Sequence, residues 1–275
     1  MSRKIFDELH AALMCADPCN KCALVSALWR DWQAGLVFER DGRPPHPLED
    51  AGRPERPVMV EPSALRSRRI GSREGHGAMI HALCHIEFTA INLALDAAWR
   101  FRDLPDDYLG DWLRVASDEA RHFGLLRAHL RSLAYDYGDF PAHAGLWDMA
   151  RRTAHDPLVR MALVPRVLEA RGLDATPPIM ERLRTIGDRV ALGILDIVLS
   201  DEITHVAVGD RWFRHLCAAR GVEPESTFLD LFNAFAAPRL QPPVNEKARL
   251  AAGFSERELA GLAAARLPPD RAKPI

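Results

Sequence analysis

Two six-residue segments of the 275-residue chain carry the same pattern of acidic residues and histidine. They read SDEARH at 117–122 and SDEITH at 200–205, and the sequence holds no other Glu-x-x-His segment. On a helix, residues three apart lie one turn apart on one face, so each segment presents a carboxylate beside an imidazole. Such ligands together are typical of iron, manganese or zinc sites. The repeat therefore indicates a duplicated helix end or a duplicated metal site.

A lone glutamate precedes each segment at nearly the same distance. The interval from Glu87 to Glu119 differs by a single position from the interval from Glu169 to Glu202. The offset between the two glutamates of the repeated segments equals the offset between their histidines, His122 and His205. This duplicated spacing predicts two helix hairpins related by a pseudo-twofold axis, with the four glutamates converging in one core.

The neighbours of these residues predict apolar helix faces. Glu87 shares its face with Ile80, Cys84 and Ile91, and an unpaired buried carboxylate is costly. Four carboxylates in one core would repel one another, and two divalent cations would offset them. The ligand types favour iron, with manganese or zinc as alternatives. The predicted metal ligands are Glu87, Glu119, His122, Glu169, Glu202 and His205.

A solvated Glu–His pair is the ordinary reading of either segment alone, and only the six-residue constellation favours metal. His81 and His85 point away from the Glu87 face and are expected to be structural histidines. Surface or helix-end positions are expected for Arg160, Arg166 and Arg171.

The rest of the chain must supply the helices that position these residues. Apolar residues recur at helical spacing, and no stretch has the period of a strand. The expected elements are one or two helices within 4–35, an extended Pro-rich segment at 41–62, long helices at 77–102, 106–134, 146–171 and 188–219, and two or three short helices in 224–275.

Local signals suggest where some of these elements begin and end. Asp156 and Pro157 predict a capped new start inside the third helix. Gly172 predicts its end, and the TPP segment at 176–178 predicts another start. The segment SERE at 255–258 reads as a capping box.

Together these elements predict an all-α fold. We expect one domain over 1–275, with N-terminal helices and an extended wrap in 1–76, a four-helix bundle in 77–219 and a helical C-terminal extension in 220–275.

The ligand order and spacing across 77–219 resemble the ferritin-like di-iron carboxylate superfamily. Its bundles use one Glu from each of two helices and Glu-x-x-His from each of the other two. The resemblance implies that Glu119 and Glu202 bridge the two metals. Longer stretches, from HIEFTAINLALDAAWRF to PPVNEKARLAAGFS, resemble a widespread bacterial ferritin-like family of unknown function, which implies no reaction.

The DEARH segment also resembles the Asp-Glu-x-Arg-His motif of bacterial multicomponent di-iron monooxygenases. By this likeness Asp118 and Asp201 orient ligand histidines, whose second ring nitrogen needs a partner. Arg121 would support Asp118. Thr204 stands at the corresponding position of the second copy, so the two halves should differ in electrostatics.

Composition excludes several classes of protein. Hydrophobic residues make up 48%, charged residues 27%, and the net charge is −2, which gives no general attraction to nucleic acid or membrane. Only the cluster Arg66, Arg68, Arg69 and Arg73 would support a substrate such as tRNA. No apolar run approaches the ~18–20 residues that a span is expected to need, and the first residues do not show the long apolar run that is typical of a signal peptide. We therefore expect a cytoplasmic protein, with Cys15, Cys19 and Cys22 as buried thiols rather than a zinc or redox site.

Three functions fit this sequence. The first is an O2-activating oxidoreductase or hydroxylase on a small molecule, with a homodimer as a compatible assembly. The second is a ferroxidase or storage protein, and the third is a helical scaffold with structural metal. The long segments on either side of the bundle, 1–76 and 220–275, argue against a storage cage. The three tyrosines are remote in sequence from every proposed ligand, which argues against a tyrosyl-radical role.

Overall fold

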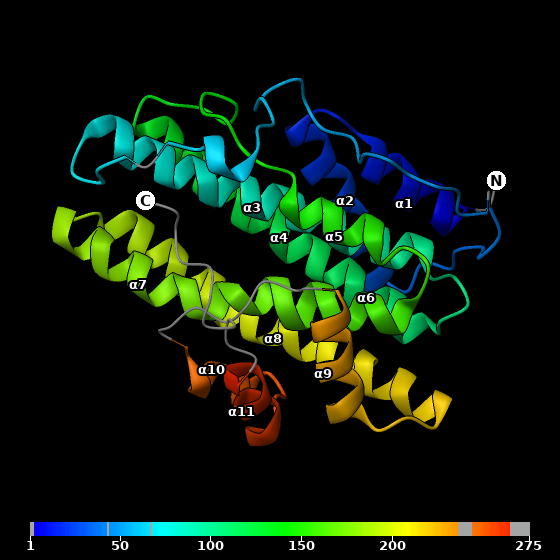
Figure 1. Ribbon diagram of the computed structural model, residues 1–275. Helices are drawn as coiled ribbons and strands as arrows, with labels where there is room; N and C mark the ends of the chain where they lie inside the picture. Colours follow the sequence, from blue (N-terminus) through cyan, green and yellow to red (C-terminus); the bar gives the residue numbers. More distant parts are fainter. Residues whose placement is uncertain (1–2, 43, 67, 236–243, 265–275) are drawn as a thin grey trace. The chain divides into compact units, whose positions relative to one another are not determined.

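Helix-forming sequence accounts for most of the chain, and the expected all-α fold is confirmed. The computed structural model describes residues 3–42, 44–66, 68–235 and 244–264 (Figure 1). Over these residues its only β-type pairings are two isolated bridges, and its long helices are compatible with a four-helix bundle. Internal contacts divide the chain into two units, residues 1–154 with 182–198 and residues 155–181 with 199–275.

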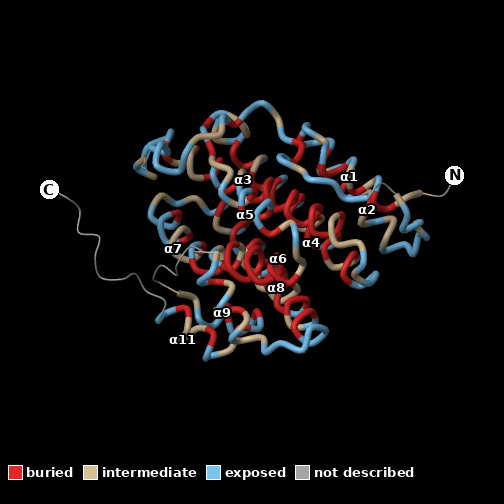
Figure 2. The backbone as a smooth tube through the Cα atoms, turned by 45° about the vertical axis from the view of Figure 1, so that its right-hand side comes forward, coloured by how far each residue is buried: buried red, intermediate tan, exposed pale blue. Residues whose placement is uncertain are grey.

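The first unit is built around a hairpin of two long helices, α3 (Arg73–Arg100) and α4 (Asp106–Ser132). α3 begins four residues earlier than expected, because Ser72 Oγ accepts the Gly75 N–H at 3.0 Å and caps it. Every residue of α3 from Glu87 to Trp99 is buried, as the red stretch in Figure 2 shows. A helix that is buried on all sides forms the centre of a core.

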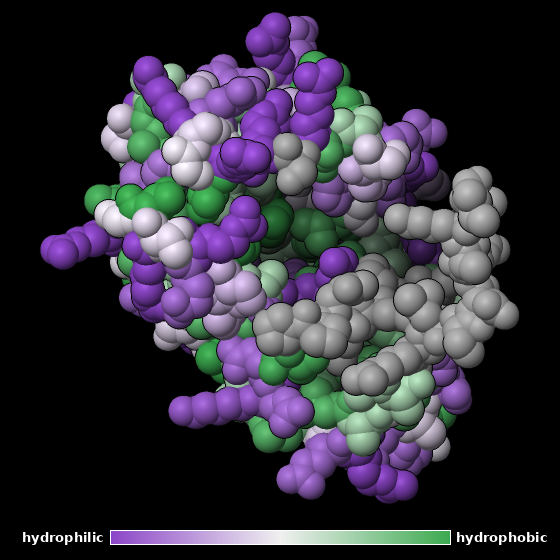
Figure 3. All heavy atoms as spheres, turned by 60° about the vertical axis from the view of Figure 1, so that its left-hand side comes forward, coloured by the Kyte–Doolittle hydropathy of each residue, from purple (hydrophilic) through white to green (hydrophobic). Residues whose placement is uncertain are grey.

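The apolar composition of α3 is accounted for by its burial inside the protein. Contrary to the expectation that no run is long enough, α3 passes a length and hydropathy test for a membrane span. However, 72% of the apolar window is buried inside the protein, as in the core helix of a soluble protein. On the face drawn in Figure 3, hydrophilic side chains project outward between smaller hydrophobic patches.

Two N-terminal helices pack on this hairpin, α1 (Ile5–Met14) on α3 and α2 (Pro18–Gln33) on α4. The buried residues of α2 are Pro18, Lys21, Val25 and Leu28, which form a stripe at helical spacing. Cys19 and Cys22 lie beside this stripe, so Cys19 is exposed and Cys22 half-buried. The prediction of three buried thiols is therefore wrong.

The described residues between α2 and α3 are mostly extended, as expected, apart from the short helix η1 (Pro62–Ala64). Hydrogen bonds fasten this segment to its neighbours at two points. Gly52 N–H donates to Leu13 O at 3.0 Å, and a Cβ at Gly52 would lie 2.2 Å from Met14 O. Trp147, in α5 (Gly145–Arg152), donates its indole N–H to Glu49 O at 2.8 Å.

In the second unit, α6 (Pro157–Leu163) begins as predicted. Asp156 Oδ1 accepts the Leu158 N–H at 2.8 Å, and Pro157 occupies the first turn. A π-helical segment, η2 (Val164–Glu169), then leads into α7 (Ala170–Ile186).

The expected end at Gly172 and new start at 176–178 are wrong, because α7 continues through Pro177 and Pro178. A proline has no N–H for the carbonyl four residues earlier. Asn245 replaces that donor: its Nδ2 donates to Leu173 O at 3.2 Å. A partner from a distant part of the sequence therefore helps α7 continue past the first proline.

α8 (Arg189–Arg220) ends before Gly221, as predicted, and Gly221 has a left-handed φ of 66°. Three short helices follow, α9 (Pro224–Ala234), α10 (Glu246–Ala251) and α11 (Glu256–Ala264). The predicted capping box is confirmed: Ser255 Oγ accepts the Glu258 N–H at 3.1 Å, and Glu258 Oε2 accepts the Ser255 N–H at 2.9 Å. Part of the stretch PPVNEKARLAAGFS lies outside the described residues.

Two of the three arginines expected at the surface are buried. Arg171 is exposed, but Arg160 is 1% and Arg166 0% exposed. Arg166 Nη2 donates to Glu258 Oε1 at 2.6 Å, and its Nε lies 3.0 Å from Asp210 Oδ1. Two buried carboxylates from distant segments compensate the charge, which local sequence could not reveal.

Candidate metal centre

The first three predicted ligands meet inside the α3–α4 hairpin. Glu87 comes from α3, and Glu119 and His122 come from one face of α4. His122 Nδ1 lies 3.3 Å from Glu87 Oε2 and 3.4 Å from Glu119 Oε2. One ligand atom from each residue lies within 4.8 Å of the others, and no residue of the three is more than 3% exposed.

This cluster concentrates charge where water is excluded. Burial, followed by the charge of Glu119, raises the pKa of Glu87 to about 8. Burial alone would lower the pKa of His122, but its contacts with Glu119 and Glu87 outweigh burial and raise that pKa to about 11. Positive charge is therefore favoured between the two carboxylates, and a divalent cation would supply it with these side chains as ligands.

The second unit holds the other three predicted ligands. Glu202 Oε1 lies 3.9 Å from His205 Nδ1, one turn along α8, and these residues are 9% and 1% exposed. Glu169 is half-buried and ends the π-helical segment η2. Single π-helical turns inside α-helices occur frequently at functional sites.

The packing of η2 on α8 indicates which residues of α8 lie at the level of Glu169. A Cβ at Gly209 would lie 2.3 Å from Pro165 Cβ, so the backbone of α8 touches η2 at that point. The two-residue turn between α7 and α8 makes the helices antiparallel. Glu169 follows Pro165 by four residues and His205 precedes Gly209 by four, so Glu169 lies near the level of His205.

The acidic residues behind the ligands are placed differently in the two units. Asp118 Oδ1 lies 3.7 Å from Arg121 Nη2, and its Oδ2 lies 3.9 Å from Arg114 Nε. Asp201 is half-buried, and Thr204 is exposed. The expected Arg121–Asp118 ion pair is therefore present in the first unit. The role of Asp118 and Asp201 in orienting histidines stays a prediction.

His81 and His85 of α3 make hydrogen bonds to the connection between α4 and α5, as structural histidines would. His81 Nε2 accepts the Gly138 N–H at 2.9 Å, and burial, followed by the charge of His85, lowers its pKa to about 4. His85 hydrogen-bonds Tyr137 Oη at 3.0 Å and His143 O at 3.1 Å.

One tyrosine, Tyr137, lies closer to the predicted ligands than its distance in the sequence suggested. The Tyr137 ring lies 5.3 Å from that of Phe88 and 5.2 Å from that of Phe123, the residues that directly follow Glu87 and His122. The connection 133–144 has no periodic pattern that could have indicated this packing.

A small cavity opens on the α3 face that carries His85. Its walls come from the extended segment, α3, the connection and α5, and they include Arg53, Met59, His85, Asn92, Tyr137 and Trp147. The cavity volume is ≈ 40 Å³, which is room for roughly three water molecules. The extended segment before α3 thus forms one wall of a partly open space beside the α3–α4 hairpin.

Comparison with known proteins places these residues in a sequence family. Residues 14–260 match a family described as "Protein of unknown function (DUF455)". The chain is 44% identical over 266 residues to an "Uncharacterized protein" of Haemophilus influenzae (strain ATCC 51907 / DSM 11121 / KW20 / Rd), which covers 93% of this chain and 92% of the relative. No solved structure matches the chain.

Proposed function

Because the chain belongs to the DUF455 family, whose description names no reaction, we propose its function from the site itself: a dinuclear metal protein that activates O2 in the cytoplasm. The observation that carries this proposal is the buried cluster of Glu87, Glu119 and His122, with His122 Nδ1 3.3 and 3.4 Å from two carboxylates. Likeness to the ferritin-like di-iron proteins is part of the same proposal. Five free cysteines suit a reducing compartment.

The duplicated spacing extends this cluster to a six-residue ligand set. Glu169, Glu202 and His205 stand in the second repeat where Glu87, Glu119 and His122 stand in the first. Four carboxylates and two imidazoles would suit two divalent ions of iron or manganese, and the resemblance implies that Glu119 and Glu202 would serve both ions. When bound as a ferrous pair, the ions would supply electrons to O2.

The chain's own side chains would bind the metals, exclude water and orient the ligands. The all-buried stretch Glu87–Trp99 keeps solvent from the α3 face of the cluster. Asp118 and Asp201 would hold the second ring nitrogen of ligand histidines and so fix the ring orientation.

Two observations favour an oxidoreductase over a storage protein. The residues before α3 form two packed helices and a fastened extended segment, which a storage shell does not need. They also line part of the cavity that Phe88 lines, and Phe88 directly follows Glu87 in the sequence. A small-molecule substrate and a small oligomer, such as a homodimer, complete the proposal.

The test is metal analysis and sizing of the purified full-length protein, followed by stopped-flow mixing of its ferrous form with O2. We expect two irons per chain, a small oligomer and a fast O2-dependent absorbance change. A large hollow assembly that accumulates many irons per chain would replace the proposal with storage. Two zinc ions without O2 reactivity would replace it with a structural scaffold.

A further inference from the structure

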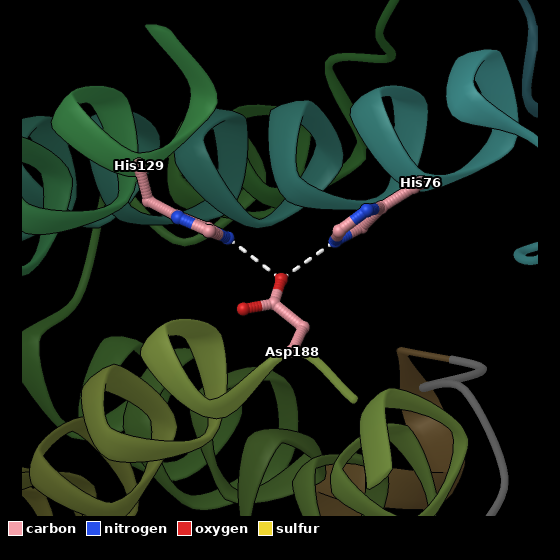
Figure 4. A group of neighbouring side chains, drawn as sticks. All are labelled: His76, His129 and Asp188. Atoms are coloured by element: carbon pink, nitrogen blue, oxygen red, sulfur yellow. Dashed lines mark hydrogen bonds and ion pairs between the residues drawn. The ribbon is translucent and has the colours of Figure 1, made fainter. Parts of the chain in front are cut away.

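Three side chains from separate segments meet at the open end of the α3–α4 hairpin, where α3 begins and α4 ends. His76 stands in the first turn of α3, His129 in the last turn of α4, and Asp188 precedes α8. The Nε2 atoms of His76 and His129 lie 2.6 and 2.7 Å from the same oxygen, Asp188 Oδ2 (Figure 4). All three residues belong to the first unit.

The cluster is sheltered but keeps an opening to solvent. The side chains of His129 and Asp188 are each 6% exposed, and that of His76 is 17% exposed. His129 follows His122 by seven residues, about two turns or roughly 10 Å along α4. The cluster is therefore separate from the carboxylate-rich centre.

Other contacts hold the ligand atoms in place. Asp188 Oδ1 accepts the Ala191 N–H at 2.9 Å at the start of α8, which leaves Oδ2 facing the histidines. His129 Nδ1 lies 3.4 Å from Ser132 Oγ. Metal-binding histidines and carboxylates are usually oriented in this way by a partner on the atom that does not bind.

The three ligand atoms are drawn together by two hydrogen bonds, so they lie slightly closer to one another than the ligand atoms of a bound metal ion would. One ligand atom from each residue lies within 4.8 Å of the others. Metal–ligand bonds of about 2.0–2.2 Å require ligand atoms roughly 3–3.5 Å apart. The histidine–carboxylate distances would have to open by less than about 1 Å to reach that spacing, which small side-chain rotations provide.

We propose that His76, His129 and Asp188 form a second, mononuclear site for a divalent transition metal. Two imidazoles and one carboxylate are the protein ligands of zinc sites that keep an open position and of non-haem Fe²⁺ sites. A bound ion would fasten the start of α8 to both helices of the hairpin. Its remaining position would face solvent on the His76 side.

Zn²⁺ titration of the metal-free, full-length protein against a chromophoric chelator tests this site. Asp188→Asn removes the charge but keeps an oxygen that can cap α8, since Asn caps as well as Asp. His76→Gln changes the most exposed ligand and should fold normally. The exposed His155→Gln is the matched control, and Glu119→Gln reports the other centre.

We expect wild type and His155→Gln to bind one more Zn²⁺ than Asp188→Asn or His76→Gln, or to bind it at least about tenfold more tightly. Zn²⁺ should raise the unfolding temperature by a larger amount in wild type than in His76→Gln. The difference should persist in the Glu119→Gln background, which separates this site from the proposed dinuclear centre. Equal Zn²⁺ stoichiometry, affinity and stabilisation in all variants would show a hydrogen-bond clamp without metal and overturn the proposal.

Discussion

His122 Nδ1 lies 3.3 Å from Glu87 Oε2, although the two residues are far apart in the chain. Both are buried, one on each helix of the α3–α4 hairpin, and Glu119 lies 3.4 Å from the same nitrogen. An imidazole between two buried carboxylates is stable only if positive charge accompanies it. The cluster could therefore hold either a proton or a metal cation, and the two would compete for the same ligand atoms.

Removing one carboxylate charge should release metal. Glu119→Gln keeps the shape of the side chain but removes its charge, so we expect the proposed dinuclear centre to lose one or both of its two ions per chain. The same loss is expected for Glu202→Gln, the equivalent change in the second repeat. Inductively coupled plasma mass spectrometry of the purified proteins measures this.

The control is His85→Gln, on the same helix as Glu87 but hydrogen-bonded to Tyr137. Its metal content should equal that of wild type. Unchanged content in both glutamine variants of the glutamates would contradict the ligand assignment.

The helices and the ligand candidates could be predicted because their signals are local. Apolar residues at helical spacing indicated α3, α4 and α8, and the repetition of the Glu-x-x-His pattern indicated the ligand candidates. Caps at Asp156 and Ser255 were readable because a cap involves residues two or three apart.

What the sequence could not reveal depends on distant partners. α7 passes Pro177 because Asn245 supplies a donor from another segment. His76, His129 and Asp188 come from two helices and the residue before a third, and they share no spacing rule. Tyr137 reaches the rings beside the ligands through an irregular connection.

A buried lysine should make stability depend on pH. Lys21 is 0% exposed, and its Nζ donates to Leu13 O at 2.8 Å and to Asn92 Oδ1. Burial lowers its pKa to about 7, whereas an unfolded chain holds that proton to about pH 10. Between these values the unfolded chain binds more protons, so the free energy of unfolding rises with pH.

Urea unfolding of wild type and Lys21→Met at pH 7 and pH 9 measures this effect. The wild type should gain about 2 kcal/mol more than the variant over this range, from ~1.4 kcal/mol per pH unit and partial protonation at pH 7. The lost hydrogen bonds lower the variant's stability at both pH values and leave the difference in slope intact. Parallel pH profiles would show that the ammonium group stays charged when buried.

The buried Arg166 should make the largest polar contribution to the stability of the C-terminal helices. Its guanidinium carbon lies 4.0 Å from the centroid of the Phe228 ring, and its nitrogens contact Asp210 and Glu258. Arg166→Met leaves Arg214, which contacts both buried carboxylates, as the remaining cation beside them among the described residues. We expect a loss of roughly 3 kcal/mol or more in the free energy of unfolding, as for a broken buried ion pair.

Arg220→Met provides the comparison for Arg166→Met. Arg220 pairs with Asp156 at 2.7 Å, but its side chain is 42% exposed. A surface pair contributes about 0–1 kcal/mol. Adding Glu258→Gln to Arg166→Met should recover part of the loss, because one uncompensated charge is removed. Equal losses for Arg166→Met and Arg220→Met would argue against a central role for the buried arginine.

The two acidic residues behind the ligands should affect O2 chemistry more than metal content. Asp118 lies between Arg114 and Arg121, whereas Thr204 replaces the second arginine beside Asp201. Asn at either position keeps a hydrogen-bond acceptor for a ligand histidine but removes the negative charge that makes the imidazole more basic. Asp201→Asn should therefore leave about two ions per chain in the dinuclear centre and slow the O2-dependent absorbance change by roughly 10- to 100-fold.

Stopped-flow mixing of the ferrous variant with O2, beside metal analysis of the same sample, separates the effect on the rate from the effect on metal content. Asp118→Asn should have the smaller effect, because Arg121 already offsets part of its charge. Loss of metal in proportion to the loss of rate would show instead that Asp201 acts only by keeping the metal bound.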